Sequence, residues 1–186
     1  LSSLSSNFFY NPSSKIKLIG ITGTNGKTST AYYLASLFRK LNYKVGLLST
    51  IEYQIDSHTT LSTHTTPNTI IINQLLSKMV QADCDYCFME VSSHGISQKR
   101  ITGLDFDVAV FTNISRDHLD YHITFDHYLN TKKNFFDNLS IHATSIINID
   151  DSYGSLMVND SKSKKVFYSV KQKSHYNATL LQSELG

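Results

Sequence analysis

The sequence predicts an α/β domain in which a mainly parallel sheet is flanked by helices. Short apolar runs rich in β-branched residues alternate with longer segments of helical periodicity, an alternation typical of parallel sheets. A loop rich in glycine and threonine joins the first apolar run to the first helical segment. The sequence contains no internal repeat, so we expect one domain.

The first half of the chain supplies two strands and two helices. Residues 15–21 are predicted to be a buried strand and residues 43–49 the next one. Between them a helix is expected over 28–41, with an apolar face made of Tyr33, Leu34, Leu37, Phe38 and Leu41. The polar residues 57–66 are expected to form a loop. Pro67 occupies a first helical position behind Thr66 as N-cap, and this helix is expected to end near Ala82.

The second half continues the alternation. Apolar runs over 86–91, 108–112 and 143–149 predict further strands, and residues 166–169 predict one more. Residues 125–139 have the periodicity of a helix. The serine-rich residues 1–14 have the composition of a linker. We therefore expect a linker over 1–14 and one domain over 15–186.

Composition and charge exclude several classes of protein. Hydrophobic residues make up 40% and charged residues 17% of the 186, the balance of a globular protein rather than a disordered one. The formal net charge of +2 is too small to indicate a nucleic-acid partner. No apolar run reaches the roughly 18 residues of a membrane span, and the N-terminal residues lack the pattern of a secretory signal. We expect a cytoplasmic protein with no membrane partner.

The two cysteines, Cys84 and Cys87, form a C-x-x-C pair. They are too few for a disulfide framework, which fits a reducing compartment. In a strand, positions i and i+3 point to opposite faces, so the two thiols are not expected to converge on a metal. We interpret them as ordinary thiols.

The stretch GITGTNGKTST, residues 20–30, has the setting of a phosphate-binding loop between a strand and a helix. Its spacing departs from the common G-x-x-x-x-G-K-[ST] pattern, because position 21 is isoleucine. Lys27 is placed to reach the outer phosphates of a nucleotide, and the Thr28 hydroxyl to face Mg²⁺.

Two further strand ends carry polar residues that suit a metal–phosphate site. Glu90 is the one charged residue of its predicted strand and lies at the carboxyl end, where α/β sheets bind ligands. The segment 111–122, FTNISRDHLDYH, follows the next strand. His118 and His122 have the spacing of a zinc-protease helix, but Leu119 stands where the H-E-x-x-H motif needs glutamate. We interpret His122 as structural or solvated.

Four strings together resemble the Mur ligase family: TGTNGKTST, HTTP (64–67), EVSSHGISQKR (90–100) and TNISRDHLDYH (112–122). The last two resemble the MurE-type branch, which adds the third residue of the peptidoglycan peptide. The loop is similar to the T-G-T-N-G-K-T variant of that family. The resemblance covers about residues 15–151 and implies the family's P-loop-like central domain.

The resemblance implies an enzyme that uses ATP and Mg²⁺ to join an amino acid to UDP-N-acetylmuramoyl-L-alanyl-D-glutamate through an acyl phosphate. It implies that the ATP phosphates are held by Gly23, Thr24, Asn25, Gly26, Lys27, Thr28 and Ser29, with Asn148 on the nucleotide side. Thr28 and Glu90 are implied for one Mg²⁺, and His118 for a second. The implied substrate contacts are Thr65, Thr66, Ser92, Gln98 and Arg100.

The family also carries a lysine carbamylated by CO₂, whose new carboxylate helps bind the second Mg²⁺. The residue that matches it is Lys132, four positions after Tyr128, and Lys133 is its neighbour. An unmodified lysine would repel the metal at this position. We therefore expect a carbamate on Lys132 and a solvated ammonium group on Lys133.

The resemblance also implies flanking domains that grip the uridine and close over ATP. We therefore expect this chain, a central domain truncated near its C-terminal end, to be inactive alone and monomeric. Meso-diaminopimelate and L-lysine both remain open as the added residue. The alternatives are a related ligase such as folylpolyglutamate synthase, or a non-catalytic nucleotide-binding remnant.

Overall fold

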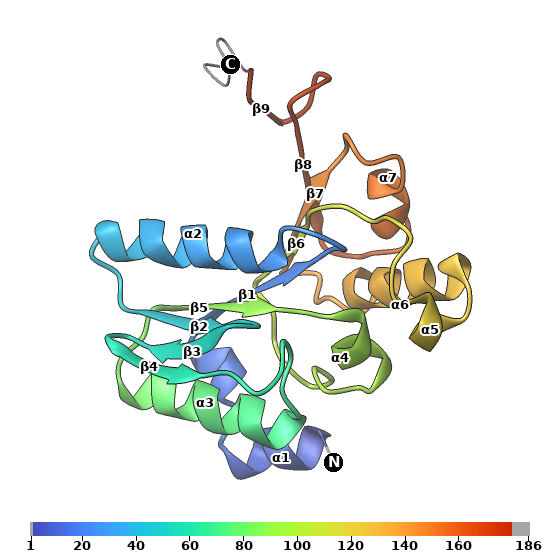
Figure 1. Ribbon diagram of the computed structural model, residues 1–186. Coiled ribbons are helices and arrows are strands. Elements are labelled where there is room, and N and C mark those ends of the chain that lie inside the picture. The colour runs from blue at the N-terminus through green and yellow to red at the C-terminus, as the bar shows by residue number, and fades with distance from the viewer. Residues whose placement is uncertain (1, 180–186) are drawn as a thin grey trace.

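The structure, a computed structural model, describes residues 2–179, and within them nine strands form one sheet (Figure 1). The strand order is β4-β3-β2-β5-β1-β6-β7-β8-β9. All neighbours from β2 to β9 pair in parallel, whereas β3 pairs antiparallel with both β2 and β4. The predicted class, mainly parallel α/β, is confirmed. The strand bounds are Lys17–Thr22 (β1), Val45–Leu48 (β2), Glu52–Ile55 (β3), His58–Leu61 (β4), Tyr86–Glu90 (β5), Val108–Phe111 (β6), Thr144–Asn148 (β7), Lys164–Ser169 (β8) and Tyr176–Asn177 (β9).

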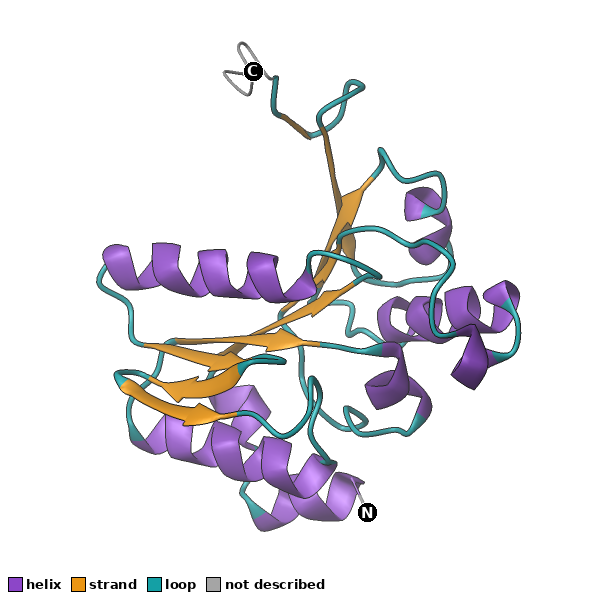
Figure 2. Cartoon of the chain, in the orientation of Figure 1, coloured by secondary structure: helices purple, strands orange, loops and turns teal. Residues whose placement is uncertain are grey.

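Helices cover both faces of the sheet, as Figure 2 shows. One face is covered by α2, and the other by α3 and α6, which contribute to a second apolar cluster. Helix α1 packs on the outer side of α3. The helix bounds are Ser2–Phe8 (α1), Lys27–Lys40 (α2), Thr69–Gln81 (α3), Ser93–Ser97 (α4), Leu119–His122 (α5), Phe125–Asp137 (α6) and Gly154–Met157 (α7), with a 3-10 helix at Pro12–Lys15.

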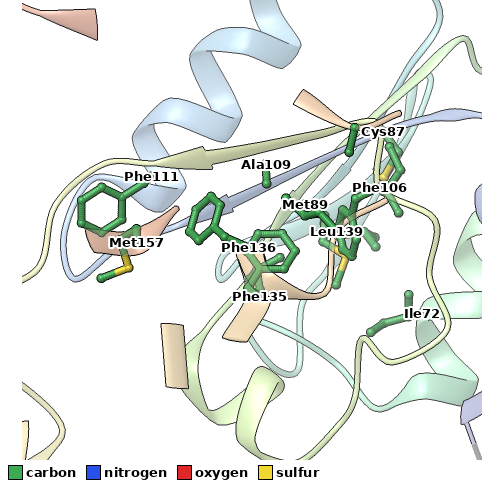
Figure 3. Packing of buried hydrophobic residues seen from close by; sticks show 14 of the residues in the cluster. Ile72, Cys87, Met89, Phe106, Ala109, Phe111, Phe135, Phe136, Leu139 and Met157 are labelled. Carbon is green, nitrogen blue, oxygen red and sulfur yellow. The ribbon is translucent and has the colours of Figure 1, made fainter. Parts of the chain in front are cut away.

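The central strand β1 divides its residues between the two cores. Ile19 and Ile21 belong to the cluster under α2, whereas Leu18 belongs to the cluster on the other face. Gly20 lies on that second face, where a Cβ would stand 2.6 Å from Phe135 and 2.8 Å from Phe106. Figure 3 shows these two aromatic rings among the buried side chains of the larger cluster. The missing side chain at Gly20 is what lets the rings approach β1.

The predicted apolar face of the first helix is wrong in part. Tyr33, Leu37 and Leu41 are among the exposed large hydrophobic residues of the structure. The buried stripe consists of Ala31 and Ala35, with the partly buried Leu34 and Phe38 beside them. Small alanines allow α2 to lie close to the sheet, so size rather than hydrophobicity selects the inward face.

Three other local predictions need correction. Residues 1–14, predicted to be a linker, contain α1 and most of the 3-10 helix, and the Ser5 hydroxyl donates to the carbonyl of Thr69. Part of the predicted loop 57–66 is strand β4, which pairs with β3 although its sequence is polar. The N-cap of α3 is Asn68, whose side chain accepts from the amides of Ile70 and Ile71, and not Thr66. The predicted end of the domain at residue 186 lies outside the described residues.

Cys84 and Cys87 are buried free thiols in one apolar cluster. The expectation that they face opposite sides of the sheet is wrong, because Cys84 precedes β5 and does not follow its alternation. Burial raises the pKa of both thiols, as expected for ordinary core cysteines. Among residues 2–179, no helix is both long and apolar enough to cross a membrane.

We predict that Gly20→Ala destabilises the fold by about 1–3 kcal/mol, because the added Cβ meets two aromatic rings of the packed core. Gly46→Ala is the matched control. Its Cβ would also collide, but with Met79, whose unbranched side chain can adopt another rotamer. Urea unfolding of both variants should give the larger loss for Gly20→Ala. A loss at Gly46 that equals or exceeds it would contradict this account of the core.

Candidate functional site

A cavity of about 490 Å³ lies at the carboxyl ends of β1, β2, β5 and β6. This is the edge at which parallel sheets collect ligand-binding loops. The cavity brings together most of the predicted site residues. Its lining includes Thr24, Asn25, Gly26, Lys27, Thr28, Ser29, Thr65, Thr66, Glu90, Ser92, Arg100, His118 and Lys132.

The glycine-rich loop leads directly into α2, with Gly26 as the N-cap at φ 83°. A Cβ at Gly26 would meet nothing within 4 Å, so the backbone is open to the cavity there. The first amides of a helix have no partner within the helix, and together with the helix dipole they form an anion site. This geometry suits an anion such as a phosphate group.

The Lys27 side chain folds back over the loop. Its Nζ donates to the carbonyl oxygens of Gly23 and Thr24 at 2.9 and 2.8 Å. Burial lowers the pKa of Lys27, and the Glu90 and Asp117 carboxylates oppose that shift. A cation held beside the helix start would add to the attraction of phosphate oxygens.

Glu90 is fully buried and hydrogen-bonded on both carboxylate oxygens. Thr28 Oγ1 donates to Glu90 Oε2 at 3.0 Å, and the amide of Thr50 donates to Oε1 at 2.7 Å. The hydroxyl of Thr50 also reaches Oε2, at 3.2 Å. The Thr28 and Glu90 oxygens thus stand side by side, the arrangement in which hard cations are bound.

Lys132 is 1% exposed, and its Nζ donates to the Gly23 carbonyl at 2.9 Å. The same carbonyl accepts from Lys27, so two lysine side chains share one acceptor. Burial, with the Lys27 charge, lowers the pKa of Lys132 to about 7. Lys133 points elsewhere and forms ion pairs with Asp137 and Asp160 at 2.8 and 2.5 Å. It is therefore paired rather than freely solvated, and Lys132 is the lysine of the site.

His118 lines the cavity in a left-handed conformation, φ 51°. Its ring lies edge-on to His94 at 5.2 Å between centroids, and its Nε2 is 3.6 Å from a carboxylate oxygen of Asp117. Left-handed backbone is unfavourable for most residues with a side chain and recurs at functional sites. The conformation fits a residue whose side chain must point in a particular direction in the cavity.

His122 is completely buried, and among residues 2–179 its Nε2 has no hydrogen-bond partner. Burial, with the charges of neighbouring histidines, lowers its pKa to about 4. The imidazole is therefore neutral near pH 7. Of the two alternatives, structural or solvated, the structure supports the structural one.

The residues predicted to contact the substrate divide into two groups. Thr65, Ser92 and Arg100 line the cavity with free surface. Thr66 is 1% exposed, and its hydroxyl is already engaged with the Glu90 carbonyl and the Ser92 amide. Arg100 donates to the Thr66 carbonyl at 2.6 Å. Thr66 therefore links Glu90, Ser92 and Arg100 through its hydroxyl and its carbonyl.

Gln98 and Asn148 are not among the residues that line the cavity. The side-chain amide of Gln98 accepts from Arg100 and donates to the Tyr121 hydroxyl, so it helps to fix the position of the guanidinium group. Asn148 donates to the Thr112 carbonyl at 2.8 Å and accepts from the Asp150 amide at 3.0 Å. The NH₂ group and the carbonyl oxygen of its side-chain amide are thus both engaged, at the ends of β6 and β7.

Sequence reasoning missed the contributions of Thr50, Asn113 and Tyr128 to the site. Thr50 and His94 line the cavity, and Tyr128 lies beneath it, with its ring 4.7 Å from Lys132 Nζ. The Tyr128 hydroxyl is 3.1 Å from that of Thr24. The position of Thr50 directly after a strand was a usable signal, whereas the role of Tyr128 depends on how α6 packs.

The residues present fit a phosphate-bound cation better than a protein-only metal site. Within residues 2–179, no group of three His, Cys, Asp or Glu side chains is close enough to hold a metal ion. Mg²⁺ is bound in proteins through one or two carboxylates with phosphate oxygens and water. Thr28 and Glu90 beside the phosphate loop match that pattern.

The chain matches the family model described as Mur ligase middle domain over residues 21–185. It is 49% identical over 185 residues to UDP-N-acetylmuramoyl-L-alanyl-D-glutamate--2,6-diaminopimelate ligase of Cytophaga hutchinsonii, with 100% of this chain and 38% of the relative covered. A solved structure of an enzyme of that name matches 87% of this chain and 34% of its own, with TM-score 0.77 and 30% identity. Folylpolyglutamate synthase of Mycobacterium tuberculosis complexed with ADP has the same fold, with TM-score 0.70, 17% identity, and 92% and 47% of the two chains covered.

The lowered pKa of Lys132 generates a prediction for stability. Folded Lys132 loses its proton near pH 7, whereas in the unfolded chain it keeps the proton up to about pH 10.5. Between these values the unfolded state binds more protons, so the free energy of unfolding should rise with pH. Below about pH 7 both states are protonated, and the full burial cost of the charge remains.

Lys132→Met removes this contribution. Between about pH 7 and about pH 9, the wild type should therefore gain stability relative to the variant. Urea unfolding at both pH values, in CO₂-free buffer, measures the difference. Parallel pH profiles for the two proteins would show that the Lys132 ammonium is not destabilised by burial.

Proposed function

The chain belongs to the Mur ligase family, and from this premise we infer that it is the ATP-binding middle domain of an ATP-dependent ligase that extends the peptidoglycan peptide. The observation that carries the proposal is the cavity in which the phosphate loop, Glu90, His118 and Lys132 meet. The chain spans 38% of the length of the Cytophaga hutchinsonii relative. The ligation reaction is therefore proposed for the protein as a whole.

We propose that the loop binds the phosphates of ATP through the amides at the start of α2 and through Lys27. The open backbone at Gly26 and the folded-back ammonium support this assignment. Phosphoryl transfer depends mainly on positioning and on neutralising charge. Lys27 would stabilise the outer phosphate while the carboxylate of the substrate attacks it.

Mg²⁺ would be held by Thr28 and Glu90, and a second Mg²⁺ by His118 and a carbamate on Lys132. When bound, the metal ions supply charge neutralisation between the two anionic reactants. Glu90 is oriented by the Thr50 amide and hydroxyl, so its carboxylate is held in place before a ligand arrives. That pre-orientation supports a role in binding rather than in proton transfer.

Carbamylation of Lys132 has a physical rationale in this structure. Burial, together with the charge of Lys27 at the same Gly23 carbonyl, lowers the pKa of Lys132, so its amine is more readily neutral, the form that reacts with CO₂. A carbamate carries a negative charge. Modification would replace repulsion from Lys27 by attraction and would add an oxygen ligand for Mg²⁺.

The substrate carboxylate would be recognised on the wall formed by Thr65, Ser92 and Arg100. The guanidinium of Arg100 is anchored by Thr66 and Gln98, which leaves its remaining donors for an anion. In the first step a carboxylate oxygen attacks the outer phosphate of ATP, which forms an acyl phosphate and releases ADP. The amine of the incoming amino acid then displaces phosphate and forms the amide bond.

We propose UDP-N-acetylmuramoyl-L-alanyl-D-glutamate as the acceptor and 2,6-diaminopimelate as the added residue. Support comes from the names of the matched relatives at 43–49% identity, each of which is a ligase for that amino acid. The remaining alternative, a nucleotide binder without catalysis, predicts ATP binding but no amide formation. The assays below separate the two.

Mg-ATP binding tests the nucleotide part of the proposal. Lys27→Ala should weaken binding at least about tenfold, because a charged hydrogen bond to phosphate is lost. Lys40→Ala, in the last turn of the same helix, is the matched control and should bind as the wild type does. Isothermal titration calorimetry measures both. Equal affinities for wild type and Lys27→Ala would contradict the assignment of the loop.

Ligation by the whole protein tests Lys132. Lys132→Ala should abolish amide formation, because the second cation loses its ligand, and short carboxylic acids should restore part of the activity where chloride salts do not. Lys133→Ala is the matched neighbour and should retain activity with some loss of stability from its ion pairs. Full activity of Lys132→Ala would refute the carbamate.

A further inference from the structure

The side chain of Asn113 pairs with the backbone of Asn25 in the phosphate loop. Its Oδ1 accepts from the Asn25 amide at 3.0 Å, and its Nδ2 donates to the Asn25 carbonyl at 3.0 Å. The primary amide thus meets one donor and one acceptor of the same residue, as a neighbouring strand would. The reversed orientation of the amide would place donor against donor and acceptor against acceptor, so the pairing sets the side chain's direction.

The backbone around Asn113 strengthens this attachment. The Asn113 carbonyl accepts from the Thr24 amide at 2.8 Å, and the Thr112 hydroxyl donates to the Asn25 carbonyl at 2.7 Å. A Cβ at Gly23 would lie 1.9 Å from that hydroxyl and 3.0 Å from the Asn113 carbonyl. The segment after β6 therefore lies directly against the loop after β1, and glycine makes the close approach possible.

This pairing decides which backbone groups can meet a phosphate. The amides of Thr24 and Asn25 are already engaged, so neither is offered to an anion. The amides that begin α2, from Gly26 to Ser29, remain without helical partners. Asn113 itself is not among the residues that line the cavity. Its side chain therefore contacts the loop from outside the cavity, through its hydrogen bonds to Asn25.

We propose that Asn113 is a positioning residue for phosphate binding. Its side chain forms hydrogen bonds with both the amide and the carbonyl of Asn25. These bonds hold the loop so that the amides from Gly26 to Ser29 and the Lys27 side chain face the phosphates. The inference rests on the proposed function of the loop. Without the Asn113 side chain, the Asn25 amide loses its hydrogen-bond partner and the Asn25 carbonyl keeps only the Thr112 hydroxyl. The loop is then less ordered before binding, and the entropy of ordering it is lost in the binding step.

The experiment compares Asn113→Ala with the wild-type chain in calorimetric titrations with Mg-ATP and with Mg-tripolyphosphate, and it records thermal unfolding without ligand. Asn138→Ala is the matched control. Asn138 caps the C-terminal end of α6, and its side-chain amide donates to the Asn134 carbonyl at 2.7 Å. We expect Asn113→Ala to weaken both ligands by about tenfold, the scale set by two partly compensated hydrogen bonds. The loss should be equal for the two ligands, since the loop faces only the phosphates. Asn138→Ala should leave both affinities unchanged.

Asn113→Asp serves as a second variant of nearly the same size, in case Asn113→Ala does not fold. It keeps the acceptor for the Asn25 amide but sets an oxygen against the Asn25 carbonyl, so it too should weaken both ligands. Unchanged affinities together with a lower melting temperature would show a purely structural role and overturn the inference alone. Binding of neither ligand by the wild-type chain would instead overturn the proposed function of the loop, and the inference with it.

Discussion

The carbonyl oxygen of Gly23 accepts hydrogen bonds from Lys27 and Lys132, and the arrangement of the site depends on this shared acceptor. One lysine begins the helix after β1, and the other comes from α6, more than a hundred residues later in the chain. At Gly23 the loop lies close against Thr112, where a Cβ would stand 1.9 Å from the Thr112 hydroxyl oxygen. The two lysine side chains thereby meet at one cavity, and burial, with the charge of Lys27, lowers the pKa of Lys132 to about 7.

The rest of the site is organised by oriented polar groups rather than by charge alone. Glu90 is held by Thr28 and Thr50, so the end of β5, the start of α2 and the loop after β2 contribute to one carboxylate environment. Thr66 links the Glu90 carbonyl to the Ser92 amide, and its own carbonyl receives Arg100. Buried polar groups are costly unless they are hydrogen-bonded, and here the bonds that satisfy them also set their directions. The wall proposed for substrate binding and the carboxylate proposed for Mg²⁺ therefore form one connected network.

Particular elements show where sequence patterns succeed and where they fail. The helix over 125–139 was predicted nearly to its ends, because its apolar positions and its Thr124 cap agree with its packing. In α2 the same method chose Tyr33 and Leu37, although Ala31 and Ala35 face the sheet. Hydrophobicity identifies apolar positions on a helix but does not tell which of them pack against the sheet and which face the solvent. Strand β4 was missed because the polar HTTL segment is ordered by pairing with β3 and not by burial.

By itself the sequence determined the α/β class, a candidate phosphate loop and the candidacy of Glu90, because strand ends and glycine spacing are local signals. The candidacy of His118 and Lys132 came from the resemblance of their motifs to a known family. The motif match had already chosen Lys132 over Lys133, and the tertiary structure showed that Lys132 enters the cavity whereas Lys133 forms ion pairs with Asp137 and Asp160. The tertiary structure also decided the engagement of Thr66 and Asn148, and it revealed the grip of Asn113 on Asn25. Hydrogen bonds between residues far apart in sequence leave no local pattern, and they form only when the strands are placed side by side.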